Sequence, residues 1–466
     1  MRHCDKMSTI RSQNVDMTVG SPTGHLVRFA IPMLIGNLFQ QLYNLVDSVI
    51  VGRYVGADAL AAVGATGSVT FLFFALCNGI GSGGGIVTSQ YFGMGDDTNV
   101  RKTIINSAYI MLAMSAIVGG LAYVLSSPIL KFLATPDSIL ADALSYMRLQ
   151  CLGLIFVALY NFAASMLRAL GDSRTPLYFL IISCLINVAL DIFFVYNLNM
   201  GVFGAALATV ISQFLSGVAC LIFAFKTNVY FRFERDDLKP DKDISVKTIK
   251  LGAPLSMQFA LIAISCMALQ RVVNGYGEVA VAAFTATSRV EQVIHQPYQT
   301  LGASLSTFSG QNYGARRNER VLNGFHKSLI MMAVFSLLML PVMQLGSHAI
   351  VRIFVDDEAV IEMGARALQL TSYFYVSLGI IYVVRGVLTG VGDAVFALEN
   401  GIVEVIGRLI FPVAFTMIPV WGVWGIWWSV GATWTISGGT ALIRYIRYGR
   451  KIGIRETAAK NAEYTV

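Results

Sequence analysis

Twelve long apolar runs, separated by short polar connectors, are the feature that most constrains how this chain can fold. Six lie near residues 26–50, 59–91, 103–126, 139–167, 176–197 and 201–225, and six more near 247–274, 280–308, 321–346, 360–388, 396–418 and 423–445. A helix needs about 20 apolar residues to span a bilayer, so each run is long enough. The sequence therefore predicts an all-α polytopic membrane protein with twelve transmembrane helices.

The composition leaves little sequence for anything outside the membrane. Hydrophobic residues make up 55% of the 466 residues and charged residues only 13%, whereas soluble domains contain about 25% charged residues. A soluble protein is therefore excluded. The six cysteines show no metal-type spacing, so we expect neither a disulfide framework nor a metal site built on them, and we expect no cofactor.

The net charge of +7 is concentrated in alternate connectors and in both tails. The other connectors hold only Arg53, Lys131, Arg271, Arg352 and Arg366. Basic residues accumulate on the cytoplasmic side of membrane proteins, so we expect a multi-pass protein of the cytoplasmic (inner) membrane with both termini in the cytoplasm. Because the charge follows the membrane topology, we expect no nucleic-acid partner.

The chain carries an internal repeat, in which matching residues recur 221 positions apart. The pairs include Gly56 and Gly277, Gln90 and Gln311, Gly171 and Gly392, Asp172 and Asp393, and Gly201 and Gly422. The polar stretch 226–246 divides the runs six and six. We therefore predict two pseudo-symmetric six-helix bundles related by an axis along the membrane normal. They comprise an N-lobe at 1–230 with the N-terminal tail, a cytoplasmic linker at 231–246, and a C-lobe at 247–466 with the C-terminal tail.

Polar side chains follow one side of the first predicted helix, where they must face protein or water rather than lipid. The stripe consists of Asn37, Gln40, Gln41, Asn44 and Asp47. Amides alone are typical of hydrogen bonds between helices. A carboxylate inside the membrane is costly and indicates a functional site. The fifth predicted helix repeats the pattern with Ser183, Asn187 and Asp191 on one face.

Asp47 and Asp191 have no Lys or Arg within one turn of their own helices. Each must take up a proton, bind an ion or find a basic partner elsewhere, for which Arg148 on the fourth predicted helix is the structural alternative. The fourth and sixth helices add facing polar side chains, namely Tyr146, Gln150, Asn161, Thr209 and Gln213. Carboxylates among hydroxyls and amides can hold a proton or Na⁺.

The membrane charges of the second half come as pairs. Arg289 lies near Glu291 on the eighth predicted helix, and Glu404 lies one turn before Arg408 on the eleventh. Opposite charges one turn apart neutralise each other, so we favour a structural or gating role over ion coupling. His295 is interpreted as a satisfied polar residue rather than a ligand.

A run of glycines from Gly79 to Gly85 lies inside the second predicted helix. No strand precedes it, so we interpret it as a place of close helix packing rather than a dinucleotide site. The sequence contains no Walker loop ending in Gly-Lys-Ser/Thr, so we do not expect the chain to hydrolyse ATP. The pattern favours a transporter driven by a gradient or a partner chain, and not an enzyme.

Several motifs, in this order, resemble those of multidrug and toxic compound extrusion (MATE) transporters. They are Gln41-Leu-Tyr-Asn-Leu-Val-Asp47, Val51-Gly-Arg-Tyr-Val-Gly56, Ala59-Leu-Ala-Ala-Val-Gly64, Leu170-Gly-Asp-Ser-Arg-Thr-Pro176 and Asn187-Val-Ala-Leu-Asp191. The similarity covers residues 25 to 450. It implies twelve helices in two lobes of six, a V-shaped cleft, and export of organic cations in exchange for H⁺ or Na⁺.

The resemblance also implies a coupling site. In the DinF-like branch the N-lobe site is formed by residues that match Asp47, Asn187 and Asp191, with polar partners that match Tyr146, Asn161 and Thr209. The NorM-like branch carries an acid on helix seven, where this chain has Gln258 after Pro254. A Na⁺ site in the C-lobe is therefore disfavoured, and an ion at Asp47 and Asp191 is the expectation.

These observations predict a monomeric antiporter that exports amphipathic, cationic compounds from the cytoplasm. The polar side chains expected to line its substrate cavity are Asn37, Gln40, Gln41, Asn44, Gln150, Gln213 and Gln258.

Pro32 is expected to bend the first helix, either as a moving hinge or as a static kink. The alternatives are a flippase for lipid-linked precursors, which would need several cations in its cavity, and a non-transporting scaffold or receptor.

Overall fold

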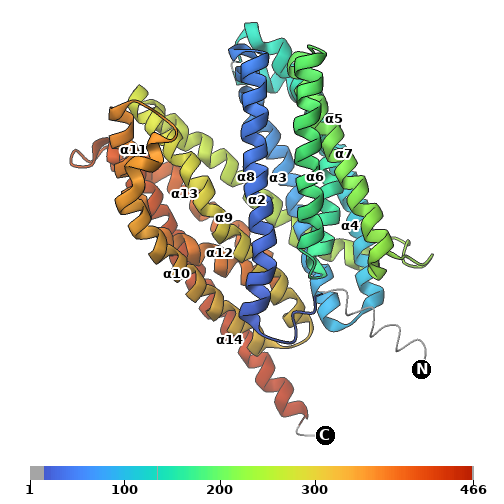
Figure 1. Ribbon diagram of the computed structural model, residues 1–466. Coiled ribbons are helices and arrows are strands. Elements are labelled where there is room, and N and C mark those ends of the chain that lie inside the picture. Colours follow the sequence, from blue (N-terminus) through green and yellow to red (C-terminus); the bar gives the residue numbers. More distant parts are fainter. Residues whose placement is uncertain (1–14, 134, 464–466) are drawn as a thin grey trace. The chain divides into compact units, whose positions relative to one another are not determined.

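The computed structural model describes residues 15–133 and 135–463, and these residues form helices joined by short connections (Figure 1). The first half contains α2 (Pro22–Tyr54), α3 (Ala57–Met94), α4 (Asp97–Phe132), α5 (Asp137–Ala169), α6 (Arg174–Asp191) continued by η1 (Ile192–Asn197), and α7 (Gly201–Thr227). The second half contains α8 (Lys242–Asn274), α9 (Glu278–Gly314), α10 (Asn318–Arg352), α11 (Glu358–Ser372) followed by α12 (Tyr375–Gly390), α13 (Ala394–Thr416) and α14 (Gly425–Glu463). Each predicted run is helical, as one helix or as two consecutive helical segments, so the all-helical prediction is confirmed.

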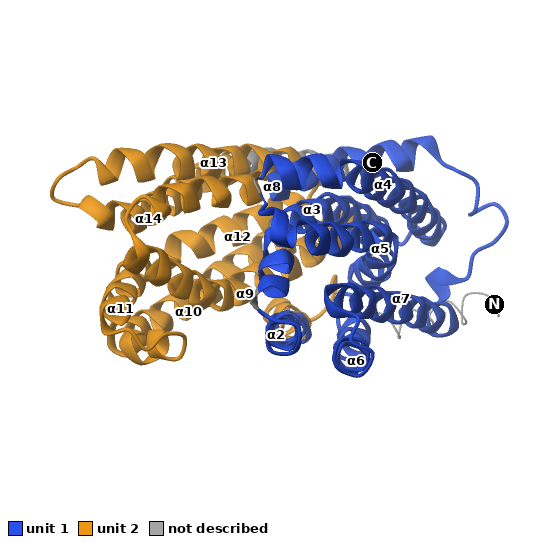
Figure 2. Cartoon of the chain, turned by 90° about the horizontal axis from the view of Figure 1, so that it is seen from above, with its two compact units in different colours: residues 1–16, 31–260 blue, residues 17–30, 261–466 orange. Residues whose placement is uncertain are grey.

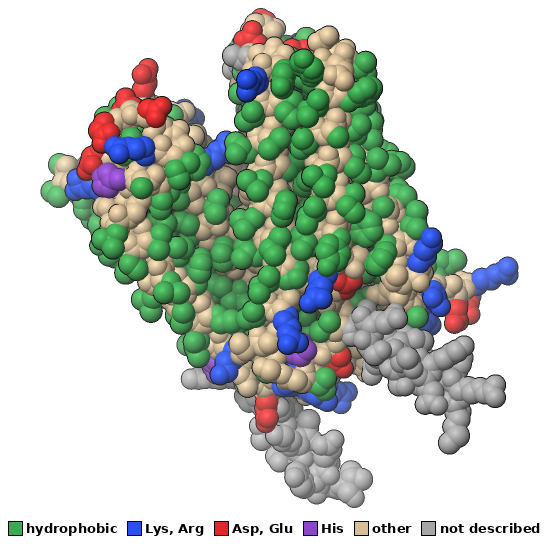
Figure 3. Space-filling model, viewed as in Figure 1, with side chains coloured by type: hydrophobic (Ala, Val, Ile, Leu, Met, Phe, Trp, Pro, Cys, Tyr) green, Lys and Arg blue, Asp and Glu red, His purple; other side chains and the backbone are tan. Residues whose placement is uncertain are grey.

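The surface of the described residues is that of a membrane protein. Hydrophobic side chains cover the face that α2 and α6 present, and Lys, Arg, Asp and Glu gather near helix ends (Figure 3). Seven described helices are long and apolar enough to cross a bilayer, and the bent pair of α11 and α12 together makes an eighth. The remaining long helices carry more polar and charged side chains within their apolar runs, as α9 does with Glu291 and His295.

The internal repeat is visible in the backbone. Three pairs of glycines that lie 221 positions apart all adopt positive φ, a conformation that costs glycine little because it has no Cβ. The pairs are Gly56 (123°) with Gly277 (85°), Gly171 (90°) with Gly392 (101°), and Gly201 (57°) with Gly422 (49°). The two halves therefore turn between helices at equivalent places.

The tenth predicted run is not one continuous helix, because α11 and α12 meet at a bend of 54°. The carbonyl of Gln369 accepts hydrogen bonds from Ser372 Oγ at 2.6 Å and from Gln344 Nε2 at 2.8 Å. In a straight helix that carbonyl would accept from the backbone N–H of Tyr373, which instead bonds to Thr371 O. Side chains have thus replaced the backbone bond at the break.

The helices cluster into two compact units (Figure 2). Unit 1 contains residues 31–260 with Met1–Asp16, and unit 2 contains Met17–Ala30 with Leu261–Val466. In unit 1, α5 packs against α3, α4 and α7, and in unit 2 α9 packs against α10, α11 and α12, and α14 against α12 and α13. These units do not coincide with a division at the linker. The first turns of α2 belong to unit 2, and the first half of α8 belongs to unit 1.

The segment that begins α2 is bound firmly within unit 2. The backbone N–H of Met17 donates to Gln311 Oε1 at 2.9 Å, and Arg320 Nη2 donates to the Met17 carbonyl at 3.0 Å. Arg317 Nη1 donates to the Thr18 carbonyl at 2.6 Å. The end of α9 and the start of α10 therefore hold this segment by its backbone, so a change of side chain in the segment would leave these bonds in place.

The beginning of α8 is held in unit 1 in a similar way. Asn106 Oδ1 accepts from the Asp241 N–H at 2.9 Å, and Ser256 Oγ donates to the Leu76 carbonyl at 2.7 Å. A Cβ at Gly79 would collide with the backbone of Ser256. The predicted role of the glycine run in close helix packing is confirmed, and its partners include α8.

Candidate functional site

The centre of the predicted site is a pair of carboxyl groups within unit 1. Asp47 lies in α2 and Asp191 is the last residue of α6, and their exposed fractions are 9% and 0%. The two carboxyl groups come within hydrogen-bonding reach of each other. Two residues 144 positions apart in the sequence thus form one buried acidic pair.

The helix changes its winding directly after this pair. Residues Ile192–Asn197 form a π-helical stretch that continues α6, and such stretches are often found at functional sites. In it, the Leu198 N–H bonds to the Phe193 carbonyl, five residues back, at 3.1 Å. Asp191 therefore lies immediately before the wider π-helical turn.

No basic side chain forms an ion pair with Asp47 or Asp191 among the residues that the structure describes. Arg148, the alternative structural partner, donates to Ser126 Oγ at 3.4 Å and lies over the Tyr123 ring at 5.2 Å. Its guanidinium is thus engaged by α4 rather than by the acidic pair. The pair must be neutralised by something other than a fixed cation.

Amide and hydroxyl groups surround the pair. Asn187 Nδ2 donates to Thr209 Oγ1 at 3.5 Å, and the hydroxyls of Tyr43 and Thr209 lie 3.3 Å apart. Tyr146 is close enough to interact electrostatically with both carboxylates, and its side chain forms a hydrogen bond with that of Gln150. Tyr43 was not predicted, although it lies one turn before Asp47 and belongs to the same face of α2.

Several predicted residues lie farther away. Asn161 follows Tyr146 by 15 residues on α5, which is about 22 Å along the helix axis at 1.5 Å per residue. Asn37 precedes Asp47 by ten residues, about 15 Å. Gln40, Gln41 and Gln213 are half-buried, Asn44 is exposed, and Gln258 is buried in the part of α8 that belongs to unit 1. These residues extend from the pair rather than contact it.

The pair is rich in oxygen atoms that can accept a proton or a cation. Buried oxygens without a hydrogen-bond donor include Asp47 Oδ1, both carboxylate oxygens of Asp191 and Asn187 Oδ1. An ionised carboxylate has no proton to donate, so a hydrogen bond between two carboxyl groups requires at least one proton. When both are ionised, the same oxygens are the ligands that hard cations prefer. Within the described part of the chain no group of His, Cys, Asp and Glu fits a metal site of three or more such ligands.

The charged residues of unit 2 form a different arrangement. Glu404 accepts a hydrogen bond from Arg385 and lies 3.4 Å from Arg408 Nη2, so the predicted Glu404–Arg408 pair is confirmed and Arg385 is an additional partner. The predicted pairing of Arg289 with Glu291 is wrong, because Arg289 is exposed and has no ion pair among the described residues. A buried carboxylate between two guanidiniums is a fixed network, unlike the cation-free pair of unit 1.

His295 lies beside this network, with its ring 5.5 Å from Trp434 and 6.4 Å from Tyr382 in edge-to-face contacts. These ring contacts agree with packing rather than with ligation. Its Nε2 atom is buried and has no hydrogen-bond partner among the described residues, so the prediction that His295 is a satisfied polar residue is wrong.

Comparison with known proteins places the chain in a family. The profile of the MatE family matches residues 32–193 and 254–411, one stretch in each half of the repeat. The probable multidrug resistance protein YpnP of Bacillus subtilis (strain 168) is 30% identical over 439 residues, which cover 93% of this chain and 97% of YpnP. The multidrug export protein MepA of Staphylococcus aureus (strain N315) is 25% identical over 407 residues, which cover 87% and 89%.

Solved structures show the same fold. A crystal structure of a MATE protein in the bent conformation superposes with a TM-score of 0.86 at 23% identity, covering 96% of this chain and 98% of that one. A MATE structure in the straight conformation gives 0.86 at 24% identity, covering 96% and 99%. These structures have twelve transmembrane helices in two lobes. Because the profile matches more than half of the residues and YpnP is similar along nearly the whole length, the chain belongs to the MatE family of multi-pass membrane transporters and is not an enzyme.

Proposed function

We propose that this protein is a secondary antiporter that exports amphipathic, cationic organic compounds in exchange for H⁺ or Na⁺. The names of YpnP and MepA support drug export. The single observation that carries the coupling mechanism is the buried Asp47–Asp191 pair without a basic partner. The pair consists of the residues that the sequence resemblance matches to the N-lobe site of the DinF-like branch, and we assign the chain to that branch on this resemblance.

The negative charge of the acidic pair explains how an ion and a cationic drug can be exchanged. With both carboxylates ionised, like charges at close range repel and must be compensated by a cation. An incoming proton or Na⁺ supplies that charge from one side of the membrane, and a cationic drug competes for the same negative site from the other. Moving one charge is worth about 2.3 kcal/mol per 100 mV, so exchange of a single ion can drive appreciable accumulation.

The neighbours of the pair are joined to one another by hydrogen bonds, and the charge of the pair acts on them through space. Asn187 and Tyr43 both reach the Thr209 hydroxyl, so three helices, α6, α2 and α7, meet at one side chain. Thr209 Oγ1 itself donates to the Ala205 carbonyl at 3.1 Å. Asp191 lies one turn after Asn187, so a change of charge at Asp191 changes the electrostatic field at this hydrogen-bonded junction. We assign Tyr146 of α5 to the same coupling group, whereas Asn161, the other predicted member on α5, lies about 22 Å farther along that helix.

The amides that extend from the pair are assigned to substrate binding. The assigned residues are Asn37, Gln40, Gln41, Asn44, Gln150, Gln213 and Gln258. Amide side chains offer both donors and acceptors without charge, so they can bind varied amphipathic molecules while the carboxylates select positive charge. We further assign the protein, as a monomer, to the cytoplasmic membrane, with both termini inside the cell, from the distribution of basic residues.

The experiment that tests the proposal uses full-length protein in proteoliposomes. A fluorescent organic cation is loaded, and its movement is recorded under an imposed pH gradient and, separately, under an imposed Na⁺ gradient. Movement driven by either gradient supports antiport, and the effective gradient identifies the ion. Transport that ignores both gradients would show that the pair does not couple an ion.

The same vesicles separate the two alternatives. A flippase for lipid-linked precursors would move a labelled pyrophosphate lipid between leaflets and would not move the organic cation. A scaffold or receptor would move neither substrate. Because the oxygen-rich pair in unit 1 would repel a pyrophosphate, the observed charge distribution favours the antiporter.

A further inference from the structure

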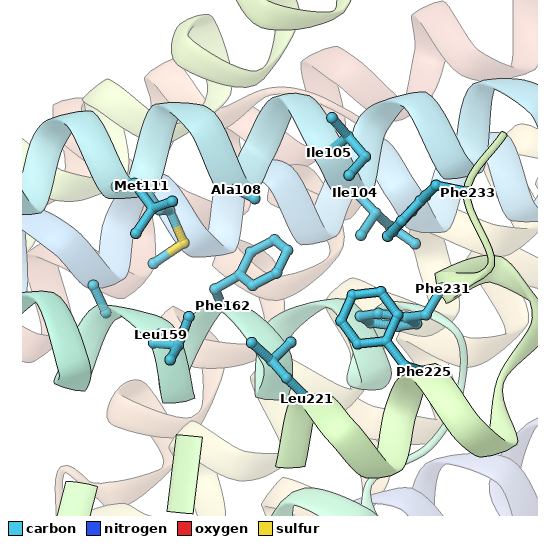
Figure 4. A pocket seen from close by; sticks show the side chains of 12 residues that line it. Ile104, Ile105, Ala108, Met111, Leu159, Phe162, Leu221, Phe225, Phe231 and Phe233 are labelled. Carbon is cyan, nitrogen blue, oxygen red and sulfur yellow. The ribbon is translucent and has the colours of Figure 1, made fainter. Parts of the chain in front are cut away.

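A cleft of about 200 Å³ lies in unit 1, and its lining includes neither member of the acidic pair (Figure 4). It is bounded by α4, α5 and α7 and by the segment that follows α7. Figure 4 shows Phe162 of α5 and Leu221 of α7 pointing into the space beneath α4, and Phe231 and Phe233 closing one end. Every side chain that lines the cleft is apolar. A polar drug or an ion would find no hydrogen-bond partner there.

The cleft opens toward the surface rather than into the core. Leu112 and Phe225, at its edges, have exposed fractions of 40% and 46%, whereas Ile104 and Phe162 at its floor are buried. From Ile104 to Leu112 the cleft follows α4 for eight residues, about 12 Å at 1.5 Å per residue. One leaflet of a bilayer has a hydrocarbon thickness of about 15 Å. The cleft thus has the length and the chemistry of a partial acyl-chain site.

Three aromatic side chains mark the end of the cleft that lies near the linker. The rings of Phe225, Phe231 and Phe233 contact each other with centroid separations of 5.9, 5.8 and 6.3 Å. Lys226 follows Phe225 directly, and Arg232 lies between the other two phenylalanines. Both cations are exposed, and Arg232 Nη2 reaches the Lys226 carbonyl at 3.5 Å. Two exposed basic residues are thus next to the aromatic end along the chain.

Two acidic residues of this region are engaged by other cations, and exposed Glu234 has no ion pair among the described residues. Asp237 accepts from Arg101 Nε at 2.7 Å, and Asp236 pairs with Lys239 at 2.8 Å. Neither Lys226 nor Arg232 has an ion pair among the described residues. Two cations beside an apolar cleft complement a molecule with one anionic end and one hydrocarbon end.

We propose that this cleft binds one acyl chain of an anionic phospholipid, whose headgroup lies against Lys226 and Arg232. Lipid tails are already in an apolar environment, so burial of a chain alone provides little preference for the site over the bilayer. Selectivity must therefore come from the shape of the cleft and from the headgroup charge. The lipid would brace α4 and α7 where the linker begins, and this role is independent of ion coupling.

The test uses full-length protein and native mass spectrometry with two probes of identical acyl chains, phosphatidylglycerol and phosphatidylcholine. Two basic residues near a membrane surface together favour an anionic lipid by roughly tenfold or more. We therefore expect phosphatidylglycerol to bind wild type roughly tenfold more tightly. Equal binding of the two lipids would overturn the proposal.

Two pairs of variants locate the site. Ala108→Phe fills the cleft from α4 and should abolish the tight binding, whereas Ala113→Phe places the same ring at an exposed position of α4 outside the lining and should not. Lys226→Gln combined with Arg232→Gln should remove the preference for phosphatidylglycerol, whereas Lys131→Gln at the other end of α4 should keep it.

A photoactivatable phosphatidylglycerol should crosslink to α4, α5 or α7 at the lining residues. Unchanged binding by Ala108→Phe, or crosslinks confined to other helices, would refute the site, and this holds whatever the transport assay shows.

Discussion

The hydroxyl of Tyr43 on α2 lies 3.3 Å from the hydroxyl of Thr209 on α7. Tyr43 precedes Asp47 by one helical turn. This contact joins the helix that carries one carboxylate to a helix that carries none. Thr209 also accepts from Asn187, so one hydroxyl joins α2, α6 and α7 beside the acidic pair.

Tyr43→Phe removes this contact and keeps the ring. A hydrogen bond of this kind contributes about 1 kcal/mol, which corresponds to about a fivefold change in an equilibrium constant. We expect a comparable slowing of gradient-driven efflux and a slightly lower melting temperature in detergent. Tyr54→Phe, at the exposed end of α2, is the control and should behave as wild type. An equal loss in both variants would rule out a specific role for Tyr43.

Asp47→Asn should abolish coupled efflux while the protein remains folded, because an amide keeps size and hydrogen bonding but cannot exchange a proton. The assay is efflux in proteoliposomes, with proton release on addition of substrate as a second measurement. Asp191→Asn should have the same effect. Asp58→Asn, at an exposed position in the first turn of α3, is the matched control. Normal gradient-driven efflux by Asp47→Asn would show that Asp47 does not couple an ion to transport.

Gln258→Ala should spare the ion dependence of transport. Gln258 is 2% exposed and carries no charge, so its removal changes packing and substrate affinity but not the charge of the ion site. The measurement is efflux as a function of the imposed gradient. Should this variant lose H⁺ or Na⁺ dependence while Asp191→Asn retains it, the assignment to the acidic pair would be wrong.

Pro32→Ala should reduce turnover more than substrate binding. Proline lacks the N–H of a normal helical bond and favours a bend, and here it lies directly after the position at which α2 passes from unit 2 to unit 1. Pro128→Ala, at an exposed proline within α4, is the control. Spectroscopic distances between labels on α2 and α6 at acidic and at alkaline pH test whether Pro32 is a moving hinge. No pH-dependent change in wild type, or the same change in the double variant Asp47→Asn/Asp191→Asn, would identify a static kink.

Gly79→Ala should destabilise unit 1. The added methyl would collide with the backbone of Ser256, and overpacking of this kind costs about 1–3 kcal/mol. Gly64→Ala on the same helix meets no atom within 4 Å and should leave stability unchanged or increase it. Thermal unfolding of both variants in the same detergent provides the comparison. Similar melting temperatures would contradict the close approach of α3 and α8.

The positions of the helices could be predicted from the sequence because a membrane span needs an uninterrupted apolar run. The acidic pair could be anticipated for a related reason, since a carboxylate in such a run is rare enough to be noticed. Which groups meet in space was harder to predict. Tyr43 resembles an ordinary core aromatic, and Arg385 lies 19 residues from Glu404 on a different helix.

Breaks within runs were also beyond the sequence pattern. The bend between α11 and α12 depends on Gln344 of α10 reaching the Gln369 carbonyl, which is a contact between distant residues. Asn161 shows the opposite problem. Its residue type suits the site, but its position 15 residues after Tyr146 on one straight helix keeps it at a distance. Helical spacing specifies a face, and it does not specify the depth at which partners meet.

The first turns of α2 belong to unit 2, and the first half of α8 belongs to unit 1. A chain cut in the linker would therefore yield two fragments that are each incomplete as folding units. The first would carry Met17 without Gln311 and Arg320 to bind it, and the second would begin α8 without the Gly79 surface on which it packs. Neither half of the gene encodes an autonomous domain, and separately expressed halves must complement each other to recover either unit.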